Sequence, residues 1–432
     1  MLLTIISSGL DAGADPCVDP SPPAAPVDCD SLGNCPVITV AGDPAWSGPG
    51  TFNGHADPTI IHDPVVADRM WLAYSWPHVV LGTDPGGSVV AMAAVENHLS
   101  RSDDGGETFS FVSDLWPAVS AADPEGSGEV GMFSSETASI VFIEDGGTTT
   151  WYGAHLRYFL RPITGYNPNY VTSWHVRIAV GTTPEALAAG PEAILGVSTT
   201  AAVYQPQVRL DELAGLPIQE CGLLNNPTLY VEGQTLYLIV ECLAFIGTEQ
   251  DFPNSTTQVF ATTPTGAPSS WVWRHAGLLA DNSLAVQLSD DTIQQPDISV
   301  AADGTLMFVV TPAHEDAGVE VGTVGDGCVA IELESIDPPM LRRDCTGHAV
   351  VRASVEGTQV KACSYNARSD TGIIAGTELA AGGEFKLHAT GVHPLGEPAA
   401  LVPAASPIAR LALIFLIASA SVLRMKRRNR LH

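Results

Sequence analysis

The sequence is poor in basic residues, with 19 Lys and Arg against 48 Asp and Glu, which gives a formal net charge of −29 over 432 residues. This deficit excludes nucleic acid as a partner, because binding to a polyanion depends on Lys and Arg side chains that neutralise phosphates. Charged residues of both signs make up only 16% of the chain, whereas 45% is hydrophobic. A chain this apolar is expected to fold rather than to remain disordered.

Signatures of several enzyme classes are also absent. The chain contains no His-Glu-x-x-His, no Gly-x-Ser-x-Gly and no Gly-rich phosphate loop, so it indicates no organic cofactor, and it lacks the Cys-x-x-Cys pair of a zinc site. Its 41 Gly and 32 Pro instead favour a turn-rich β protein over a helical bundle. We therefore expect an all-β fold.

The C-terminal residues differ from the rest of the chain. Residues 401–432 contain no acid and six of the 19 basic residues, and the run from Leu411 to Leu423 is uncharged. A cationic cluster directly after an apolar run indicates a membrane-spanning segment with its basic end in the cytoplasm. We interpret 396–410 as a linker and 411–432 as a transmembrane helix with a basic cytoplasmic tail.

This tail, with its Val402-Pro403-Ala404-Ala405-Ser406-Pro407 motif, resembles the C-terminal protein-sorting tails of exported bacterial surface proteins. The resemblance implies that 396–410 holds a sorting-like motif. An ordinary single-pass anchor is the alternative. Either way the body is expected outside the cytoplasm, in the cell envelope or at the cell surface, with the membrane as a partner through the C-terminal helix.

The N-terminal residues agree with export. Residues 1–14 combine an apolar run with the small residues Ala12-Gly13-Ala14, and we interpret them as a truncated signal peptide. Residues 15–44 are rich in Pro and Cys and are interpreted as a tether. Eight Cys fit an oxidising compartment. Two pairs flank turns and are predicted to form disulfides, Cys221–Cys242 and Cys328–Cys345, while the pairing of Cys363, Cys17, Cys29 and Cys35 stays open.

A unit of two apolar strands around a Gly/Asp or Gly/Glu turn recurs five times in the body. Several copies open with a polar residue followed by Pro, and the copies occupy 57–74, 136–153, 226–240, 295–310 and 348–363. The gaps leave room for two more strands per unit. Four antiparallel strands repeated five times predict a five-bladed β-propeller over residues 45–395, with a pair of β-sandwiches as the alternative.

A second motif supports a propeller. The segment Ser102-Asp103-Asp104-Gly105-Gly106-Glu107-Thr108-Phe109 resembles the Asp-box of sialidase-type propellers. It reads as a hairpin turn in which Gly supplies positive φ, the Asp carboxylate accepts turn N–H groups and Phe packs between strands. We expect a structural role for its five characteristic residues, Ser102, Asp104, Gly106, Thr108 and Phe109.

The hairpin units also resemble those of five-bladed family 43 glycosidases. The match is closest at 55–61, His-Ala-Asp-Pro-Thr-Ile-Ile, and the resemblance covers residues 50–390 as architecture. It implies that Asp57 is the catalytic base, because the family's first-blade Asp has that role. The family's general acid is a Glu that opens blade three, but this chain has Asn225-Asn226-Pro227 there. Glu136 and Glu220 are the remaining candidates for the acid.

In a propeller the innermost strands open at one mouth of the central channel. We therefore predict that this mouth is lined by Asp57, Glu136 or Thr137, Asn226, Gln295 and His348, and we add His55 and Asp297 as neighbouring substrate-binding candidates. Hydrolysis of a glycosidic bond requires two carboxyl groups, roughly 5 to 10 Å apart, one protonated and one ionised. The acid pairs Asp103/Asp104 and Asp290/Asp291 could bind Ca²⁺.

Three functions remain open at this point. The first is an exported protein that recognises carbohydrate at the channel mouth without hydrolysing it. The second is an active exo-glycosidase. The third is a structural or adhesive envelope protein whose propeller only presents loops.

Overall fold

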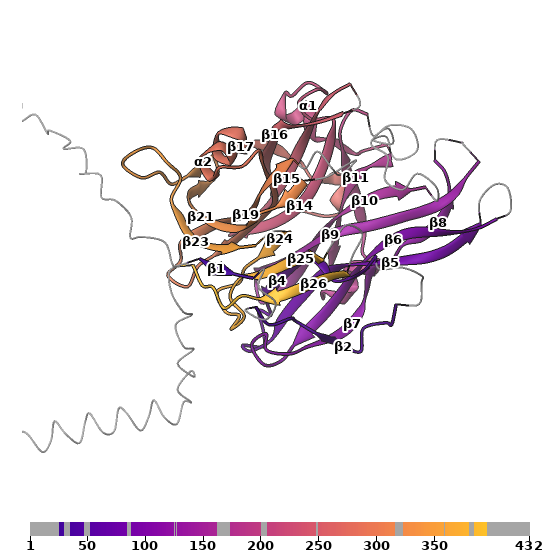
Figure 1. Ribbon diagram of the computed structural model, residues 1–432, viewed down its shortest axis with the longest axis horizontal. Coiled ribbons are helices and arrows are strands. Elements are labelled where there is room, and N and C mark those ends of the chain that lie inside the picture. The colour runs from indigo at the N-terminus through magenta and orange to yellow at the C-terminus, as the bar shows by residue number, and fades with distance from the viewer. Residues whose placement is uncertain are drawn as a thin grey trace, which may run out of the picture. The chain divides into compact units, whose positions relative to one another are not determined.

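The computed structural model of the chain describes residues 26–29, 35–46, 52–83, 88–124, 126, 128–161, 173–199, 205–247, 249–315, 323–357, 359–379 and 384–394. Five β-sheets account for most of these residues, and the two α-helices among them, α1 (Leu210–Ala214) and α2 (Asn282–Leu288), are short. The sheets form the predicted five-bladed β-propeller (Figure 1).

Each of the first four blades contains four antiparallel strands in chain order, with the innermost strand first. Blade one consists of β4 (Ala56–His62), β5 (Met70–Thr83), β6 (Val89–Ser102) and β7 (Phe109–Trp116), with β2 (Val40–Ala41) at its outer edge. Blade two consists of β9 (Val130–Asp145), β10 (Thr148–Leu160), β11 (His175–Gly181) and β12 (Glu192–Gly196), flanked by β8 (Val119–Ala122) and β13 (Val208–Arg209).

The next two blades repeat the pattern. Blade three consists of β14 (Leu223–Glu232), β15 (Thr235–Ile246), β16 (Glu249–Thr262) and β17 (Arg274–Ala280). Blade four consists of β18 (Thr292–Val300), β19 (Leu306–Glu315), β21 (Gly327–Ile336) and β23 (Val351–Glu356), with the short strands β1 (Val27–Asp28), β20 (Thr323–Gly325) and β22 (Pro339–Leu341) added.

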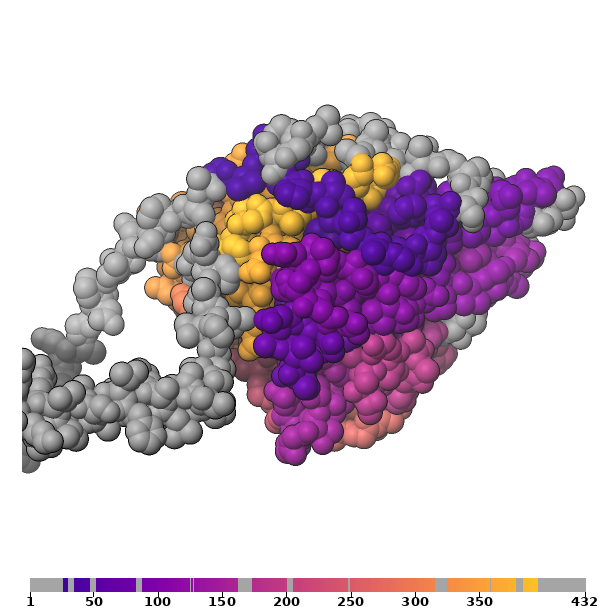
Figure 2. Space-filling view, turned by 90° about the horizontal axis from the view of Figure 1, so that it is seen from below, coloured from indigo at the N-terminus to yellow at the C-terminus, as the bar shows by residue number. Residues whose placement is uncertain are grey.

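Blade five closes the ring with strands from both ends of the propeller. Its own strands are β24 (Val360–Ser364), β25 (Ile374–Leu379) and β26 (Glu384–Ala389), and β3 (Asn53–Gly54), which precedes blade one, pairs in parallel with β26. Figure 2 shows the indigo N-terminal residues beside the yellow C-terminal strands. A Cβ atom at Gly54 would lie 1.9 Å from the Phe385 carbonyl oxygen, so only glycine fits this closure.

The hydrophobic core is divided among the blade interfaces. Separate clusters of buried apolar side chains lie between blades one and two, two and three, three and four, four and five, and five and one. In the last of these, Ile374 and Leu387 of blade five pack with Leu72 and Phe109 of blade one. Because each twisted sheet buries both faces against its neighbours, the ring is stabilised without an additional layer of helices.

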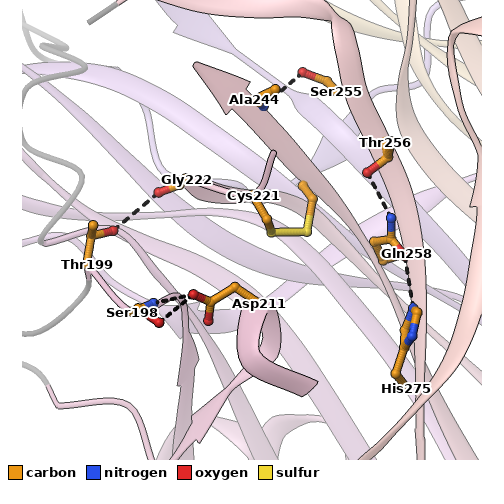
Figure 3. The surroundings of a disulfide bond; sticks show 11 residues. Ser198, Thr199, Asp211, Cys221, Gly222, Ala244, Ser255, Thr256, Gln258 and His275 are labelled. Atoms are coloured by element: carbon orange, nitrogen blue, oxygen red, sulfur yellow. Dashed lines mark hydrogen bonds between the residues drawn. A yellow bond between two sulfur atoms is a disulfide. The ribbon is translucent and has the colours of Figure 1, made fainter. Parts of the chain in front are cut away.

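Three disulfides are present among the described residues. Cys221–Cys242 is confirmed and lies in blade three, close to α1 (Figure 3). The prediction for Cys328 is wrong, because this residue in β21 is bonded to Cys363 in β24, which joins blades four and five. Cys29 is bonded to Cys35, and Cys345 is also disulfide-bonded.

The fifth predicted hairpin is wrong as well. Its two strands belong to different blades, since β23 is the fourth strand of blade four and β24 is the innermost strand of blade five. The prediction failed because a hairpin turn and a crossover between blades both place a Gly between two apolar strands, as Gly357 does here. The first four predicted hairpins are formed by β4–β5, β9–β10, β14–β15 and β18–β19.

The terminal segments are described only in part. Residues 26–29 and 35–44, interpreted as a tether, instead contribute β1 and β2 to the edges of blades four and one. The predicted signal peptide at 1–14 and the predicted linker, transmembrane helix and basic tail from 396 onward lie outside the described residues. Within the described ranges, no helix is long and apolar enough to span a bilayer.

Two buried histidines in blade two predict acid sensitivity. Burial and the charge of Arg177 lower the pKa of His175 to about 3, and the same causes, with Arg157, hold the pKa of His155 well below its usual value. Because the unfolded pKa is about 6.5, the unfolded chain binds more protons than the folded protein between pH 3 and 6.5. Stability is therefore expected to fall as pH drops through this window.

We expect His175 to contribute about 3 kcal/mol to the loss of stability between pH 6.5 and pH 4. The measurement is denaturant unfolding of wild type and His175→Asn across this range. The variant should show a shallower pH dependence, whatever its stability at pH 7, because Asn does not titrate. An exposed-histidine control, His348→Asn, should keep the wild-type slope. Equal slopes for wild type and His175→Asn would contradict the prediction.

Candidate functional site: the mouth of the central channel

The innermost strand of every blade contains the same backbone irregularity. One residue per blade has a left-handed φ between 45° and 52°, and the pairing register with the second strand shifts at that point, at Asp57, Thr137, Asn226, Gln295 and Ala362. Positive φ is unfavourable for residues other than Gly, and such strain concentrates at functional sites. The bulge turns five equivalent positions toward one axis.

These five residues line a single cavity. The cavity is open to solvent and small, with a volume of about 30 Å³, and its wall also contains the residues that follow them, including Pro58, Pro227 and Pro296. The structure therefore brings together Asp57, Thr137, Asn226 and Gln295. In blade five the position is taken by Ala362 rather than by His348.

The blades are also joined by hydrogen bonds of the side chains that lie two positions further along the innermost strands. Ser139 accepts from the Leu229 backbone N–H at 2.9 Å, Thr228 donates to Asp297 at 3.2 Å, and Ser364 accepts from the Ile60 backbone N–H at 3.1 Å. Asp297 also accepts from the Tyr365 backbone N–H at 3.2 Å. Asp297, predicted to bind substrate, thus connects blades three, four and five.

A pair of carboxyl groups lies at the boundary of blades one and two. Asp57 and Glu136 are within hydrogen-bonding distance of each other, and both are partly buried. The Tyr158 hydroxyl donates to Glu136 Oε2 at 2.8 Å, and the Gln295 side-chain amide donates to Asp57 Oδ1 at 3.3 Å. Burial and the charge of Asp57 raise the pKa of Glu136 to about 7. Near neutral pH the pair can therefore hold one proton between two carboxyl groups.

A further acid, Glu241 on β15, was not predicted from the sequence. Its carboxylate accepts from the side-chain amides of Asn225 at 3.2 Å and Asn226 at 3.1 Å, and from the backbone N–H of Gln295. Burial raises its pKa to about 7. The only signal in the sequence is that Glu241 is the single acid within the apolar run 236–246. It holds two of the residues that line the mouth.

Three predicted residues lie elsewhere. Glu220 is exposed in the turn after Pro217 and is not part of the cavity wall. His348 is exposed in a turn of blade four, where it contacts Thr346 at 2.7 Å. His55 lies just before β4, but its Nε2 is 2.7 Å from Asp43, a residue of the N-terminal segment that also contacts His98 at 2.8 Å.

The Ser102–Phe109 segment forms the turn between β6 and β7. Asp104 accepts from the Thr108 backbone N–H at 3.0 Å and from its hydroxyl at 2.6 Å, and Ser102 accepts from the Gly106 N–H at 2.8 Å. Phe109 is buried. These contacts stabilise the turn between the two strands.

The same contacts bear on the predicted Ca²⁺ ligands in this turn. The Asp103 carboxylate is paired with Arg69 at 2.7 Å and with Arg101 at 3.0 Å. Two guanidinium groups thus already neutralise Asp103, and the oxygens of Asp104 are used by the turn. Asp103 and Asp104 do not fit a cation.

Comparisons with known proteins add the following. No protein-family model matches the chain, and no curated protein matches it. Among solved structures it is similar to an exo-inulinase from Aspergillus awamori, with a TM-score of 0.44 and 12% identity over 80% of this chain and 62% of that one. It is also similar to a GH32 β-fructofuranosidase from Bombyx mori, with a TM-score of 0.41 and 11% identity over 79% of this chain and 60% of that one.

A third similar structure is the GH93 α-L-arabinofuranosidase of Fusarium graminearum, with a TM-score of 0.39 and 9% identity over 82% of this chain and 86% of that one. The chain spans less than two thirds of the length of the inulinase and of the fructofuranosidase. Similarity at this level does not assign an activity to the chain.

Proposed function

We propose that the protein binds carbohydrate at the mouth of the central channel. The observation that carries this proposal is the convergence of Asp57, Asn226 and Gln295, held by strained backbone, on one cavity. Sugars present several hydroxyl groups that both donate and accept hydrogen bonds, and amide and carboxylate side chains offer the matching acceptors and donors. A preformed cavity with a few convergent polar groups is typical of small-ligand sites.

The proposal is tested on a glycan array with the purified chain, followed by titration of the glycan that gives the strongest saturable signal. Asn226→Ala is expected to weaken that binding roughly two- to twelvefold, since a neutral hydrogen bond contributes about 0.5–1.5 kcal/mol. Ala362 has the same backbone conformation, so alanine is compatible with this position.

The matched control is Asn254→Ala. Asn254 is an exposed residue of the same blade, and its side-chain amide donates a hydrogen bond to Asp251. The variant should leave the affinity unchanged. If no glycan gives saturable binding, or if both variants bind like wild type, the channel mouth is not a carbohydrate site and a structural or adhesive role gains support.

Hydrolysis is a second candidate function, favoured by the raised pKa of Glu136, because a carboxyl group that remains protonated near pH 7 is what a general acid requires. The contact between Asp57 and Glu136 argues against it. Retaining glycosidases hold their two carboxyl groups about 5–5.5 Å apart, and inverting ones hold them further apart. A pair in hydrogen-bonding contact leaves no room for the scissile bond, so hydrolysis requires the two side chains to separate.

We also propose export from the cytoplasm. Three disulfides among the described residues support this location, since such bonds persist in oxidising compartments. The anchoring of the C-terminal tail in a membrane stays a prediction.

A further inference from the structure

Three side chains of blade four form a cluster of metal-ligating groups outside the channel. Asp290 lies between α2 and β18, His314 lies near the end of β19, and Asp326 directly precedes β21. One possible ligand atom from each, two carboxylate oxygens and an imidazole nitrogen, can be chosen so that all lie within 4.8 Å of one another. We propose that these three residues bind a divalent transition-metal ion of the Zn²⁺ type.

The backbone holds the three segments in place. Asp291 donates its N–H to the Ala313 carbonyl at 3.2 Å, and Asp326 donates its N–H to the Pro312 carbonyl at 3.0 Å. The N–H of Asp290 is bonded to the Ala285 carbonyl at 3.0 Å, at the end of α2. Because all three ligand-bearing segments are tied to rigid elements, little conformational entropy is lost when an ion is bound.

The charges of the cluster are poorly balanced without a cation. The Asp326 carboxylate contacts both the His314 ring and the Asp290 carboxyl group, and Asp291 adds a further negative charge nearby. Three acidic residues, Asp290, Asp291 and Asp326, thus lie around one imidazole. A divalent cation bound among these side chains would offset the negative charge of the carboxylates.

The ligand set selects the type of ion. Imidazole nitrogen suits Zn²⁺ and its neighbours in the first transition row, whereas Ca²⁺ takes oxygen ligands only. The Ca²⁺ predicted for Asp290 and Asp291 is therefore replaced by a Zn²⁺-type ion on Asp290, His314 and Asp326. Three protein ligands leave a coordination position for water, and the His314 side chain is 44% exposed.

This site is separate from the channel, because none of its ligands lines the cavity. It is nevertheless connected to the mouth along the chain. Asp290 precedes Gln295 by five residues, and the intervening chain enters β18. A bound ion would hold the start of the strand that carries Gln295 and Asp297, and would stabilise blade four beside blade five.

The test uses the untagged full chain after treatment with a chelator. Zn²⁺ is titrated by calorimetry, and thermal unfolding is recorded at a hundredfold excess over Kd. We expect one high-affinity Zn²⁺ per chain and a rise in Tm of roughly 3–4 °C. His314→Gln and Asp326→Asn should each weaken this binding at least about tenfold, and Co²⁺ bound in place of Zn²⁺ should lose its visible absorption band in both variants.

His348→Gln serves as the matched control, since it removes an exposed histidine of the same blade outside the cluster, and it should bind Zn²⁺ like wild type. Asp290→Asn provides a third variant if either of the first two fails to fold. The proposal is overturned if wild type takes up no Zn²⁺, if the cluster variants bind as tightly as wild type, or if Ca²⁺ binds more tightly than Zn²⁺. Glycan binding by the channel mouth is independent of these outcomes.

Discussion

Replacing Asp57 by asparagine is expected to weaken carbohydrate binding at the channel mouth roughly 10- to 150-fold. The reason is that a hydrogen bond to a charged group contributes about 1.5–3 kcal/mol, and Asp57 offers a carboxylate to the cavity. The fold should tolerate the change, because Asn226 occupies the equivalent position of blade three with the same φ of 45°. The measurement is the Kd of the best array glycan for both proteins.

A matched control is Asp303→Asn, which changes an exposed aspartate in a turn of blade four. It should leave the Kd unchanged. An Asp57→Asn variant that binds as tightly as wild type would show that the ligand does not contact this carboxylate, and the proposed site would be wrong.

The same variant separates binding from hydrolysis. If wild type releases sugar from the glycan and Asp57→Asn does not, the protein is a glycosidase and the view that it only binds carbohydrate is wrong. Removal of the Asp57 charge also takes away one cause of the raised Glu136 pKa, so this pKa should fall in the variant. An infrared titration of the protonated Glu136 carboxyl group would detect that shift.

Loss of the Cys328–Cys363 disulfide is expected to cost about 4 kcal/mol of unfolding free energy in the double variant Cys328→Ala/Cys363→Ala. The bond closes a loop with a sequence separation of 35, and the entropy of such a loop in the unfolded chain sets this magnitude. Denaturant unfolding measures the change. The double variant Cys29→Ala/Cys35→Ala, with a separation of 6, should cost about 2 kcal/mol.

The position of the Cys328–Cys363 bond predicts which strands lose protection from hydrogen exchange when this bond is removed. It joins β21 of blade four to β24 of blade five, and Cys363 lies in the cavity wall. Hydrogen exchange should therefore quicken first in β24 to β26, whereas removal of Cys221–Cys242 should affect blade three. If removal of either disulfide made exchange faster throughout the protein, the Cys328–Cys363 bond would have no specific role in joining blades four and five.

The repeated dipeptides made much of the site predictable. Asp57-Pro58, Asn226-Pro227 and Gln295-Pro296 open their strands in the same way, and the structure places all three at one cavity. Blade five has Ala362-Cys363 instead, with neither a polar residue nor Pro, so its innermost strand could not be recognised and His348 was chosen wrongly. A repeat is visible only where its characteristic residues are kept.

Contacts between blades could not be predicted in the same way. Glu136 meets Asp57 across an interface between two sheets, and Glu241 reaches Gln295 in the next blade. The first pair is 79 positions apart in the sequence and the second pair is 54 apart. The packing of one blade against the next brings each pair together, and the pattern of residues within one blade does not reveal it. For the same reason Cys328 was paired with Cys345, its neighbour along the chain, rather than with Cys363 in the next blade.

Strand periodicity and turn residues are local properties, and from them the all-β class, four of the five hairpins and most positions of the channel mouth could be predicted. The contact between Glu136 and Asp57, the Cys328–Cys363 bond and the addition of N-terminal strands to the outer edges of blades became visible only in the folded protein. These features depend on the packing of one sheet against the next, which no local pattern of residues encodes.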